Sequence, residues 1–305
     1  MNSMRLFYEN TDITETVKIH EAIFWDCIGH EADRLKLVFS DTEGLWSSWR
    51  PAKGDRLVLK DSHFSTGVMY IDQITKYSGT YALEAVSVPL SARNKKTQSW
   101  QNMRLFRLAE DLSSRNSLSL KVYGAQNHLY DSITQFEESD LAFLNRVCCR
   151  EGYVLKVTDG SIVLYDEKQL EASPATELDL QNVGEDYLFT RQTVGMYSIG
   201  IVKYFSFSGE YTEYRAQDNA VTSGCILERV ERVSSQAEAE RWAKGYLWHA
   251  NKMEYQGCFN IPFESSYSAG TVLGITELSP SKYLIHRITH DFVKQRSTVY
   301  VRGCR

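Results

Sequence analysis

Three carboxylates crowd into one short stretch of the sequence, at Glu137, Glu138 and Asp140. Paired carboxylates can act as general acid and base, which is the chemistry by which glycosidases cleave sugar polymers. Such enzymes need two groups facing a cleft at a set separation, and a sequence does not display that geometry. The run precedes a helical pattern, so its attraction to the positive end of the helix dipole explains it without catalysis.

The histidines lack the spacing of a metal site. His286 and His290 lie four residues apart on one predicted strand, where same-face side chains are separated by about 13 Å, too far for one zinc ion. His249 has no possible ligand four residues away on its predicted helix, so we interpret it as structural. The sequence contains no nucleotide-binding glycine loop and no G-x-S-x-G motif. We therefore predict that the protein is not an enzyme and needs no cofactor or metal.

The cysteines and the chain's hydropathy indicate a protein that folds in a reducing compartment. None of the six cysteines forms a C-x-x-C pair, which favours free thiols in a cytoplasm. The first residues lack the apolar stretch of a secretory signal, and no segment is apolar over a bilayer's width. We expect no membrane insertion by this chain. The cysteines are Cys27, Cys148, Cys149, Cys225, Cys258 and Cys304.

A short capped helix is the best-defined element of the sequence. Ser139 suits the N-cap, and Asp140 places negative charge at the positive end of the dipole. Gly152 stands where a left-handed C-terminal cap is needed. Asp159-Gly160 then suits a two-residue turn between the strands 153–157 and 161–165. The apolar face of the helix contains Leu141, Leu144, Val147 and Cys148, with Phe143 beside it.

These residues resemble the central signature of the phage late-control protein D family. That family comprises the hub proteins of contractile tails and is similar to the hub part of valine-glycine repeat protein G in type VI secretion. The order of elements matches over nearly the whole chain, whereas the signature covers about twenty positions. A generic capped helix beside a hairpin is the alternative interpretation. The matching residues are Gln135, Glu138, Ser139, Asp140, Phe143, Leu144, Arg146, Glu151, Gly152 and Tyr153.

Composition and patterning predict an α+β, mainly β fold. With 305 residues, 43% hydrophobic and 24% charged, the chain can form several domains with substantial cores. We expect a small antiparallel β-barrel over 1–90, an α+β middle domain over 91–180, and a second such barrel with one inserted helix over 181–305. In the middle domain a helix is predicted from about Ser99 to Arg115. The net charge of −5 argues against specific nucleic-acid binding.

The two predicted β-domains share a plan. Gly54 precedes a strand and then the run Ile71-Asp72-Gln73-Ile74-Thr75. Near the C-terminus, Gly270 precedes a strand and then Ile285-His286-Arg287-Ile288-Thr289. We therefore expect residues 54–86 and 270–301 to correspond.

The resemblance implies a structural function. It implies a homotrimer, in which two barrels per chain form a pseudo-sixfold ring between a hexameric tail tube and a trimeric spike protein. Baseplate wedge or tape-measure proteins are further possible partners. Assembly would occur in the bacterial cytoplasm, and the protein would reside in the baseplate of a phage or phage-like particle. Because the sequence stops at Arg305, we expect the spike and any lytic activity on separate chains.

The rival hypothesis is a tail-tip protein that binds or hydrolyses the cell wall. It would need a cleft with perturbed acids or an exposed aromatic platform. The loop containing Trp46 and Trp49 is the candidate platform, although a loop that plugs the first barrel is the favoured interpretation.

Overall fold

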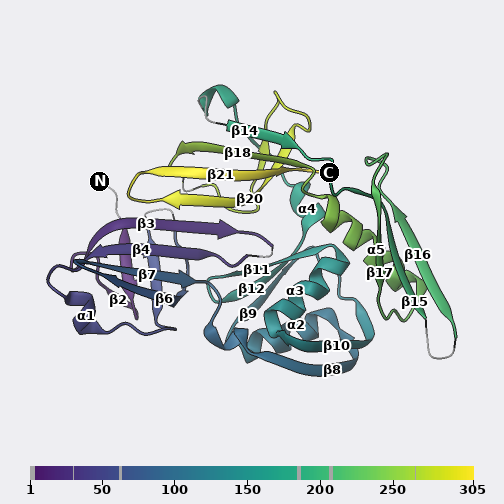
Figure 1. Ribbon diagram of the computed structural model, residues 1–305, viewed down its shortest axis with the longest axis horizontal. Helices are drawn as coiled ribbons and strands as arrows, with labels where there is room; N and C mark the ends of the chain where they lie inside the picture. Colours follow the sequence, from purple (N-terminus) through teal and green to yellow (C-terminus); the bar gives the residue numbers. More distant parts are fainter. Residues whose placement is uncertain (1–3, 30, 62–63, 184–186, 206–208, 265) are drawn as a thin grey trace.

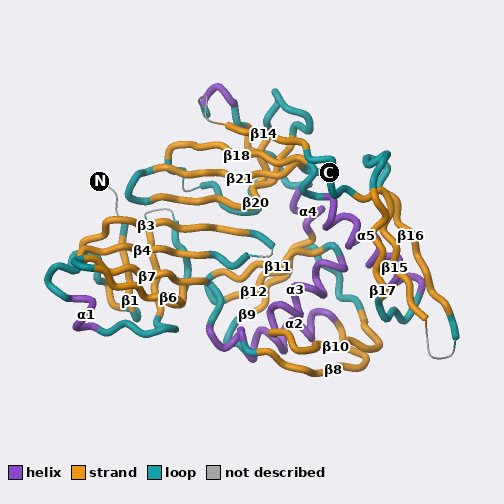
Figure 2. Tube along the Cα trace, in the orientation of Figure 1, coloured by secondary structure: helices purple, strands orange, loops and turns teal. Residues whose placement is uncertain are grey.

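The computed structural model describes residues 4–29, 31–61, 64–183, 187–205, 209–264 and 266–305. The fold is mainly β, as predicted, and most of its helices lie in the right half of the view, away from the N-terminal strands (Figures 1 and 2). A single 13-stranded sheet contains strands from both ends of the chain. Three smaller sheets, of two or three strands each, complete the structure.

The N-terminal unit is built around alternating apolar residues. In the strand Arg34–Ser40, Leu35, Leu37 and Phe39 are buried, while the residues between them are partly exposed. Trp46 is fully buried in the same core, which confirms that its loop plugs this unit. The elements are β1 (Arg5–Tyr8), β2 (Thr11–Asp12), β3 (Lys18–Cys27), β4 (Arg34–Ser40), α1 (Leu45–Trp49), β5 (Arg56–Lys60), β6 (Met69–Tyr77) and β7 (Thr80–Val86).

The C-terminal unit has its own core. Phe259, Ile285 and Val299, from three neighbouring strands, are fully buried together. The elements are β13 (Thr176–Glu177), η2 (Leu180–Asn182), β14 (Tyr187–Arg191), β18 (Tyr255–Pro262), β19 (Val272–Gly274), β20 (Lys282–Asp291) and β21 (Arg296–Gly303).

The two units have the same strand order. Antiparallel pairing gives β3-β4-β7-β6-β5 in the first and β14-β18-β21-β20-β19 in the second. The register of β6 on β7 shifts between Ile71 and Gln73, and that of β20 on β21 shifts between Ile285 and Arg287. These bulges fall at the positions that the sequence comparison aligns, so the expected correspondence is present in the fold.

A glycine turn is repeated in both units. Gly54 and Gly270 have φ of 91° and 104°, a conformation that favours glycine. The Gly54 N–H donates to the carbonyl of Ile71 at 2.7 Å, and the Gly270 N–H donates to that of Ile285 at 2.8 Å. The Ile71 and Ile285 N–H groups return hydrogen bonds of 2.8 Å to the residues after the glycines. The same backbone hydrogen bonds therefore precede the equivalent strands β5 and β19.

The two units are joined edge to edge by strand pairing. The first part of β20 pairs with β19, and Arg287–Asp291 pairs with β3 of the N-terminal unit. Among the described strands, the sheet therefore runs on from one unit into the other, from β14 at the top of Figure 1 to β6 below. The pairings of the described strands do not close either unit, so the two expected barrels are not confirmed as closed.

The middle of the chain forms the predicted α+β unit, but one boundary was wrong. Residues 99–104, expected as helix, belong to a strand, because they pair with β10 and their Trp100 stacks on Phe143 at 5.2 Å. Tertiary pairing thus overrides local helical pattern. The elements are η1 (Leu90–Arg93), β8 (Lys95–Arg104), α2 (Leu105–Arg115), β9 (Ser119–Tyr123), β10 (Leu129–Ser139), α3 (Asp140–Glu151), β11 (Tyr153–Thr158), β12 (Ser161–Asp166) and α4 (Glu167–Glu171).

The insertion in the C-terminal unit contains more than the expected helix. Three strands precede the helix and form a sheet of their own, and the helix covers one face of it (Figure 1). Val202 and Trp242 join the core of the middle unit. The elements are β15 (Tyr197–Phe205), β16 (Tyr211–Gln217), β17 (Cys225–Val230) and α5 (Gln236–Asn251).

Buried ion pairs connect the middle unit to both β units. Lys156 of β11 pairs with Asp26 of β3, and Asp26 also accepts a hydrogen bond from the backbone of the C-terminal unit at Ala269, at 2.8 Å. Arg302 of β21 pairs with Glu167 at 2.7 Å and with Glu171 of α4. These groups are almost fully buried, so each needs its partner.

We predict that Arg302→Met destabilises the protein by about 3–5 kcal/mol, because Glu167 and Glu171 would lose their main cationic partner in the interior. Urea denaturation followed by fluorescence would measure this change. The matched control is Arg296→Met on the same strand, whose side chain is exposed. Equal stability of the two variants would contradict a structural function for the network.

Candidate functional site

The signature residues come together around helix α3, as the sequence predicts. The Ser139 hydroxyl accepts a hydrogen bond from the Ala142 N–H at 3.3 Å, and Gly152 ends the helix with φ of 79°. Phe143 and Leu144 are fully buried in the middle core. The cap, the apolar face and the terminating glycine therefore have the geometry expected of them.

Asp140 is a buried carboxylate that joins three elements. It accepts hydrogen bonds from Lys96 at 2.7 Å, Gln135 at 3.0 Å and Asn116 at 3.1 Å. Burial by itself would raise the pKa of Asp140, but these hydrogen bonds outweigh it and the pKa lies below its usual value. The carboxylate is thus held ionised as an anchor between β8, β10 and α2, not as a general acid. Lys96 and Asn116 were not identified from the sequence.

Glu138 and Arg146 form a two-pronged ion pair at the surface of this cluster. The guanidinium contacts the carboxylate at 2.6 and 3.3 Å and also donates to the Thr134 carbonyl at 2.9 Å. Its charge lies over the Phe143 ring, 5.3 Å from the centroid. The signature Arg146 therefore fastens the helix to the strand that precedes it.

Glu151 connects helix α3 to the inserted helix α5. Its buried carboxylate accepts hydrogen bonds from Tyr130 at 3.0 Å, Trp242 at 2.7 Å and Arg241 at 3.1 Å. Glu151 is therefore satisfied by three donors from two distant segments. Trp242 is therefore both a buried apolar side chain and a hydrogen-bond donor.

At the C-terminal end of α3, its backbone lies close to the backbone of α5. A Cβ on Gly245 of α5 would lie 2.1 Å from the Arg150 carbonyl oxygen, so only glycine fits there. A glycine inside a helical pattern is the sequence signal that could have identified this crossing. After Gly152, Tyr153 is buried, and its hydroxyl accepts a hydrogen bond from the Gln126 N–H at 3.0 Å.

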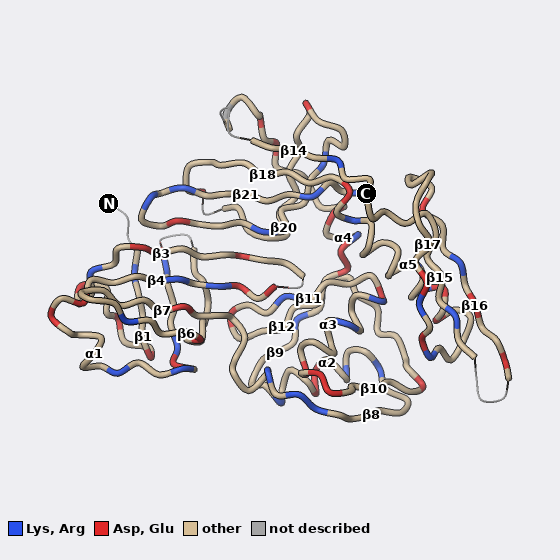
Figure 3. The backbone as a smooth tube through the Cα atoms, in the orientation of Figure 1, with Lys and Arg blue, Asp and Glu red and all other residues tan. Residues whose placement is uncertain are grey.

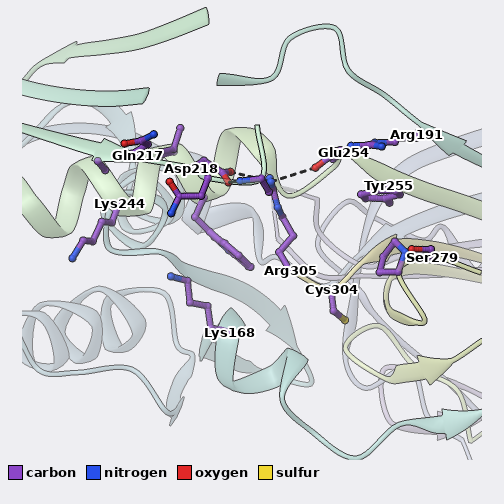
Figure 4. A pocket seen from close by; sticks show the side chains of 16 residues that line it. Lys168, Arg191, Gln217, Asp218, Lys244, Glu254, Tyr255, Ser279, Cys304 and Arg305 are labelled. Atoms are coloured by element: carbon purple, nitrogen blue, oxygen red, sulfur yellow. Dashed lines mark hydrogen bonds and ion pairs between the residues drawn. The ribbon is translucent and has the colours of Figure 1, made fainter. Parts of the chain in front are cut away.

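A cavity of about 580 Å³ lies where the α4 helix, the insertion and the C-terminal unit meet (Figure 4). Both acidic side chains of its lining pair with Arg305, Asp218 at 2.9 Å and Glu254 at 3.2 Å. Burial raises the pKa of Cys304 in its lining to about 12, so the thiol stays protonated and is a poor nucleophile. The lining shows no nucleophile with an adjacent base.

Cys149 and His249 form the pair that most resembles a catalytic dyad. The sulfur lies 4.0 Å from the His249 Nε2 atom. Burial raises the pKa of Cys149 to about 11, which opposes formation of the reactive thiolate. Among the described residues, no group of three His, Cys, Asp or Glu side chains is arranged to hold a metal ion.

Basic and acidic residues are scattered over all parts of the described chain, and no long uninterrupted run of basic residues appears along it (Figure 3). Within the same residues, no helix is both long and apolar enough to cross a bilayer.

We predict that Phe143→Ala or Leu144→Ala each destabilises the protein by about 2–5 kcal/mol, because each leaves a cavity in the middle core. Ser139→Ala should cost about 1 kcal/mol through the lost cap. Chemical denaturation would measure all three, with Phe136→Ala as control because that ring is exposed. Unchanged midpoints for both core variants would show that the helix is peripheral.

We further predict that Asp140→Asn costs about 2–3 kcal/mol at pH 7, because hydrogen bonds to a charged acceptor are lost. A lowered folded-state pKa gives stability that is present above the unfolded-state value and lost as the pH falls through the folded-state value. The difference from wild type should therefore shrink below about pH 4. Denaturation midpoints between pH 3 and 7 would test this, with the exposed Asp131→Asn as control. A difference independent of pH would contradict it.

Comparison with known proteins gives a consistent picture. The chain is 25% identical over 191 residues to a probable baseplate hub protein of Escherichia phage 186, a match that covers 56% of this chain. The match covers 47% of that relative, so it spans about half the relative's length. No protein-family model matches the sequence.

Solved structures extend the likeness of fold over the whole chain. A tail protein of Neisseria meningitidis MC58 has a TM-score of 0.75 at 12% identity, covering 99% of this chain and 96% of its own. A tail protein of prophage MuSo2 from Shewanella oneidensis has a TM-score of 0.74 at 12% identity, covering 99% and 98%. A component of the Escherichia coli type VI secretion system has a TM-score of 0.56 at 12% identity, covering 93% and 73%. The expected resemblance of this chain to the baseplate hub family of phage tails is confirmed.

Proposed function

We propose that the protein is a structural hub of the baseplate in a contractile phage tail or related injection particle. Three copies would form a ring, with residues 1–90 and 181–305 as its repeating β units and residues 91–180 as the part that braces them. The tail tube would sit on one side of this ring and a trimeric spike protein on the other. Assembly in the bacterial cytoplasm and residence in the particle follow from this function.

The internal duplication is the observation that supports this proposal best. A sixfold tube can contact a threefold object evenly only if each chain offers two similar surfaces. Here, both units have the same strand order, the same glycine turn and the same bulge. The units are also already joined edge to edge, which is the kind of contact that a ring repeats.

The side chains support a structural function over an enzymatic one. Three of the buried charged groups, Glu151, Asp140 and Arg302, are each held by several partners within the chain. Trp46 is fully buried, so the candidate aromatic platform is part of a core. We therefore propose that the protein catalyses nothing and binds no cofactor.

We predict that the purified protein forms trimers at high concentration, and that the spike protein encoded with it increases the trimer fraction. Sedimentation equilibrium and native mass spectrometry, with and without that spike protein, would measure this. Electron microscopy of the trimer should show six similar β units around a channel.

A monomer under all these conditions, or a ring of another symmetry, would contradict the proposal. So would hydrolysis of purified peptidoglycan that a single carboxylate substitution abolishes, since that result favours the tail-tip hydrolase.

A further inference from the structure

Two edges of the 13-stranded sheet are open in the single chain. The second half of β6, Gln73–Tyr77, pairs with β7 on one side, and β14 pairs with β18 on one side. No other described strand pairs with either segment on its second side. The two edges lie at opposite ends of the unit order, with β14 at the top of Figure 1 and β6 below.

The duplication shows what belongs at the open edge of β6. In the order of strands, β6 corresponds to β20, and β14 corresponds to β3. The second half of β20 is not open, because β3 pairs with it. The pairing of β3 with β20 is therefore one complete contact between two units. The equivalent strands, β14 and the second half of β6, are both present in the chain but do not pair with each other.

We propose that β14 of one copy pairs antiparallel with the second half of β6 of the next copy, in the register that β3 and β20 use within the chain. This inference rests on the proposed trimeric hub and specifies how its copies meet. The occupant of each open edge is a second copy of this protein. Because the contact is head-to-tail, a ring closes only if the rotation between copies is a fraction of a full turn.

The corresponding positions fix the register. Aligning Ile285 with Ile71 makes Thr289 equivalent to Thr75, and the pairings of β18 and β4 make Trp25 equivalent to Thr190. Thr289 pairs with Trp25 inside the chain. Thr75 should therefore lie opposite Thr190 of the next copy. By the same shift, Tyr77 should lie opposite Leu188 and Gln73 opposite Gln192.

The backbone of β14 is oriented as this register requires. The Gln192 N–H donates to the Glu254 carbonyl at 2.7 Å. Backbone groups alternate in direction along a strand, so the N–H and C=O groups of Thr190 and Leu188 also face β18. Phe189 and Arg191 then point theirs at the open edge. Inside the chain, Ile28 directly follows the equivalent strand β3, and its N–H donates to the His286 carbonyl at 3.1 Å. This bond makes Thr289 and Trp25 a pair without mutual hydrogen bonds, and Thr75 and Thr190 inherit that geometry.

Each open edge carries an exposed apolar side chain that a paired strand would cover. Tyr77 is 62% exposed and Leu188 is 66% exposed, and the register places them opposite each other on one face. Open edges that carry apolar side chains are avoided unless a partner covers them. A strand from a second copy would satisfy the backbone groups and cover both residues.

Disulfide cross-linking tests the register directly. The variant Thr75→Cys/Thr190→Cys, in a Cys225→Ser background because Cys225 is exposed, should oxidise to covalent dimers and closed trimers. Opposed residues without mutual hydrogen bonds have Cα atoms about 4.5 Å apart, within disulfide range. The matched control, Tyr77→Cys/Thr190→Cys, shifts one cysteine by two residues to about 7–8 Å, and should cross-link poorly.

A second variant tests the same interface without introducing cysteines. Lys76→Pro removes a backbone N–H donor that faces the open edge. The melting temperature of the monomer should stay unchanged, because that donor has no partner among the described residues of the chain in this register, while the dissociation constant of the trimer should rise more than about tenfold. Lys76→Ala should trimerise like wild type. Analytical ultracentrifugation would measure both.

The outcomes separate the two proposals. Trimers that cross-link only through the shifted pair, or that tolerate Lys76→Pro, would overturn this interface and leave the hub function standing. A covalent ladder that extends beyond the trimer would overturn ring closure. A wild-type protein that stays monomeric, and whose cysteine variant gives no cross-linked species, would overturn the interface and the proposed function together.

Discussion

The pairing of β20 with β3 is the interaction on which the architecture depends. It joins the two ends of the chain and makes one sheet from two units that the middle unit separates in the sequence. Strand pairing can do this because a sheet edge presents backbone donors and acceptors that must be satisfied. The bulge in β20 divides the strand, so that one half pairs within its own unit and the other half pairs with its neighbour.

The middle unit is attached to both sides of that junction. Lys156 and Arg302 take part in buried ion pairs that fix the middle unit to one β unit each. Helix α3 lies at the centre of this brace, because Asp140 at its start and Glu151 at its end are both held by donors from other segments. Glu138 and Asp140, which resemble catalytic acids in the sequence, instead make structural contacts with Arg146 and Lys96.

This arrangement favours an assembly function. A hub of the proposed kind would need fixed relative positions of its units. Buried charge networks are poor sources of net stability but penalise any displacement that separates the partners. In the proposed ring, the duplicated units would supply repeated contact surfaces, and the ion pairs of the middle unit would hold those surfaces in one geometry.

The sequence by itself determined the local features of the protein. Ser139, Gly152 and Asp159-Gly160 specify a helix start, a helix end and a hairpin turn through short-range backbone chemistry. The correspondence of Gly54 with Gly270 was visible for the same reason, since a required positive φ restricts the residue type.

Tertiary structure alone decided the features that depend on distant partners. Residues 99–104 became a strand because β10 lies beside them, and Glu151 found its donors on a helix some 90 residues away. Whether each β unit closes on itself or shares a sheet with the other unit also depends on which strand edges pair, here those of β20 and β3. Strand edges are chemically alike, because every residue except proline carries the same backbone groups, so the choice between a closed barrel and a shared sheet is not encoded in any short segment.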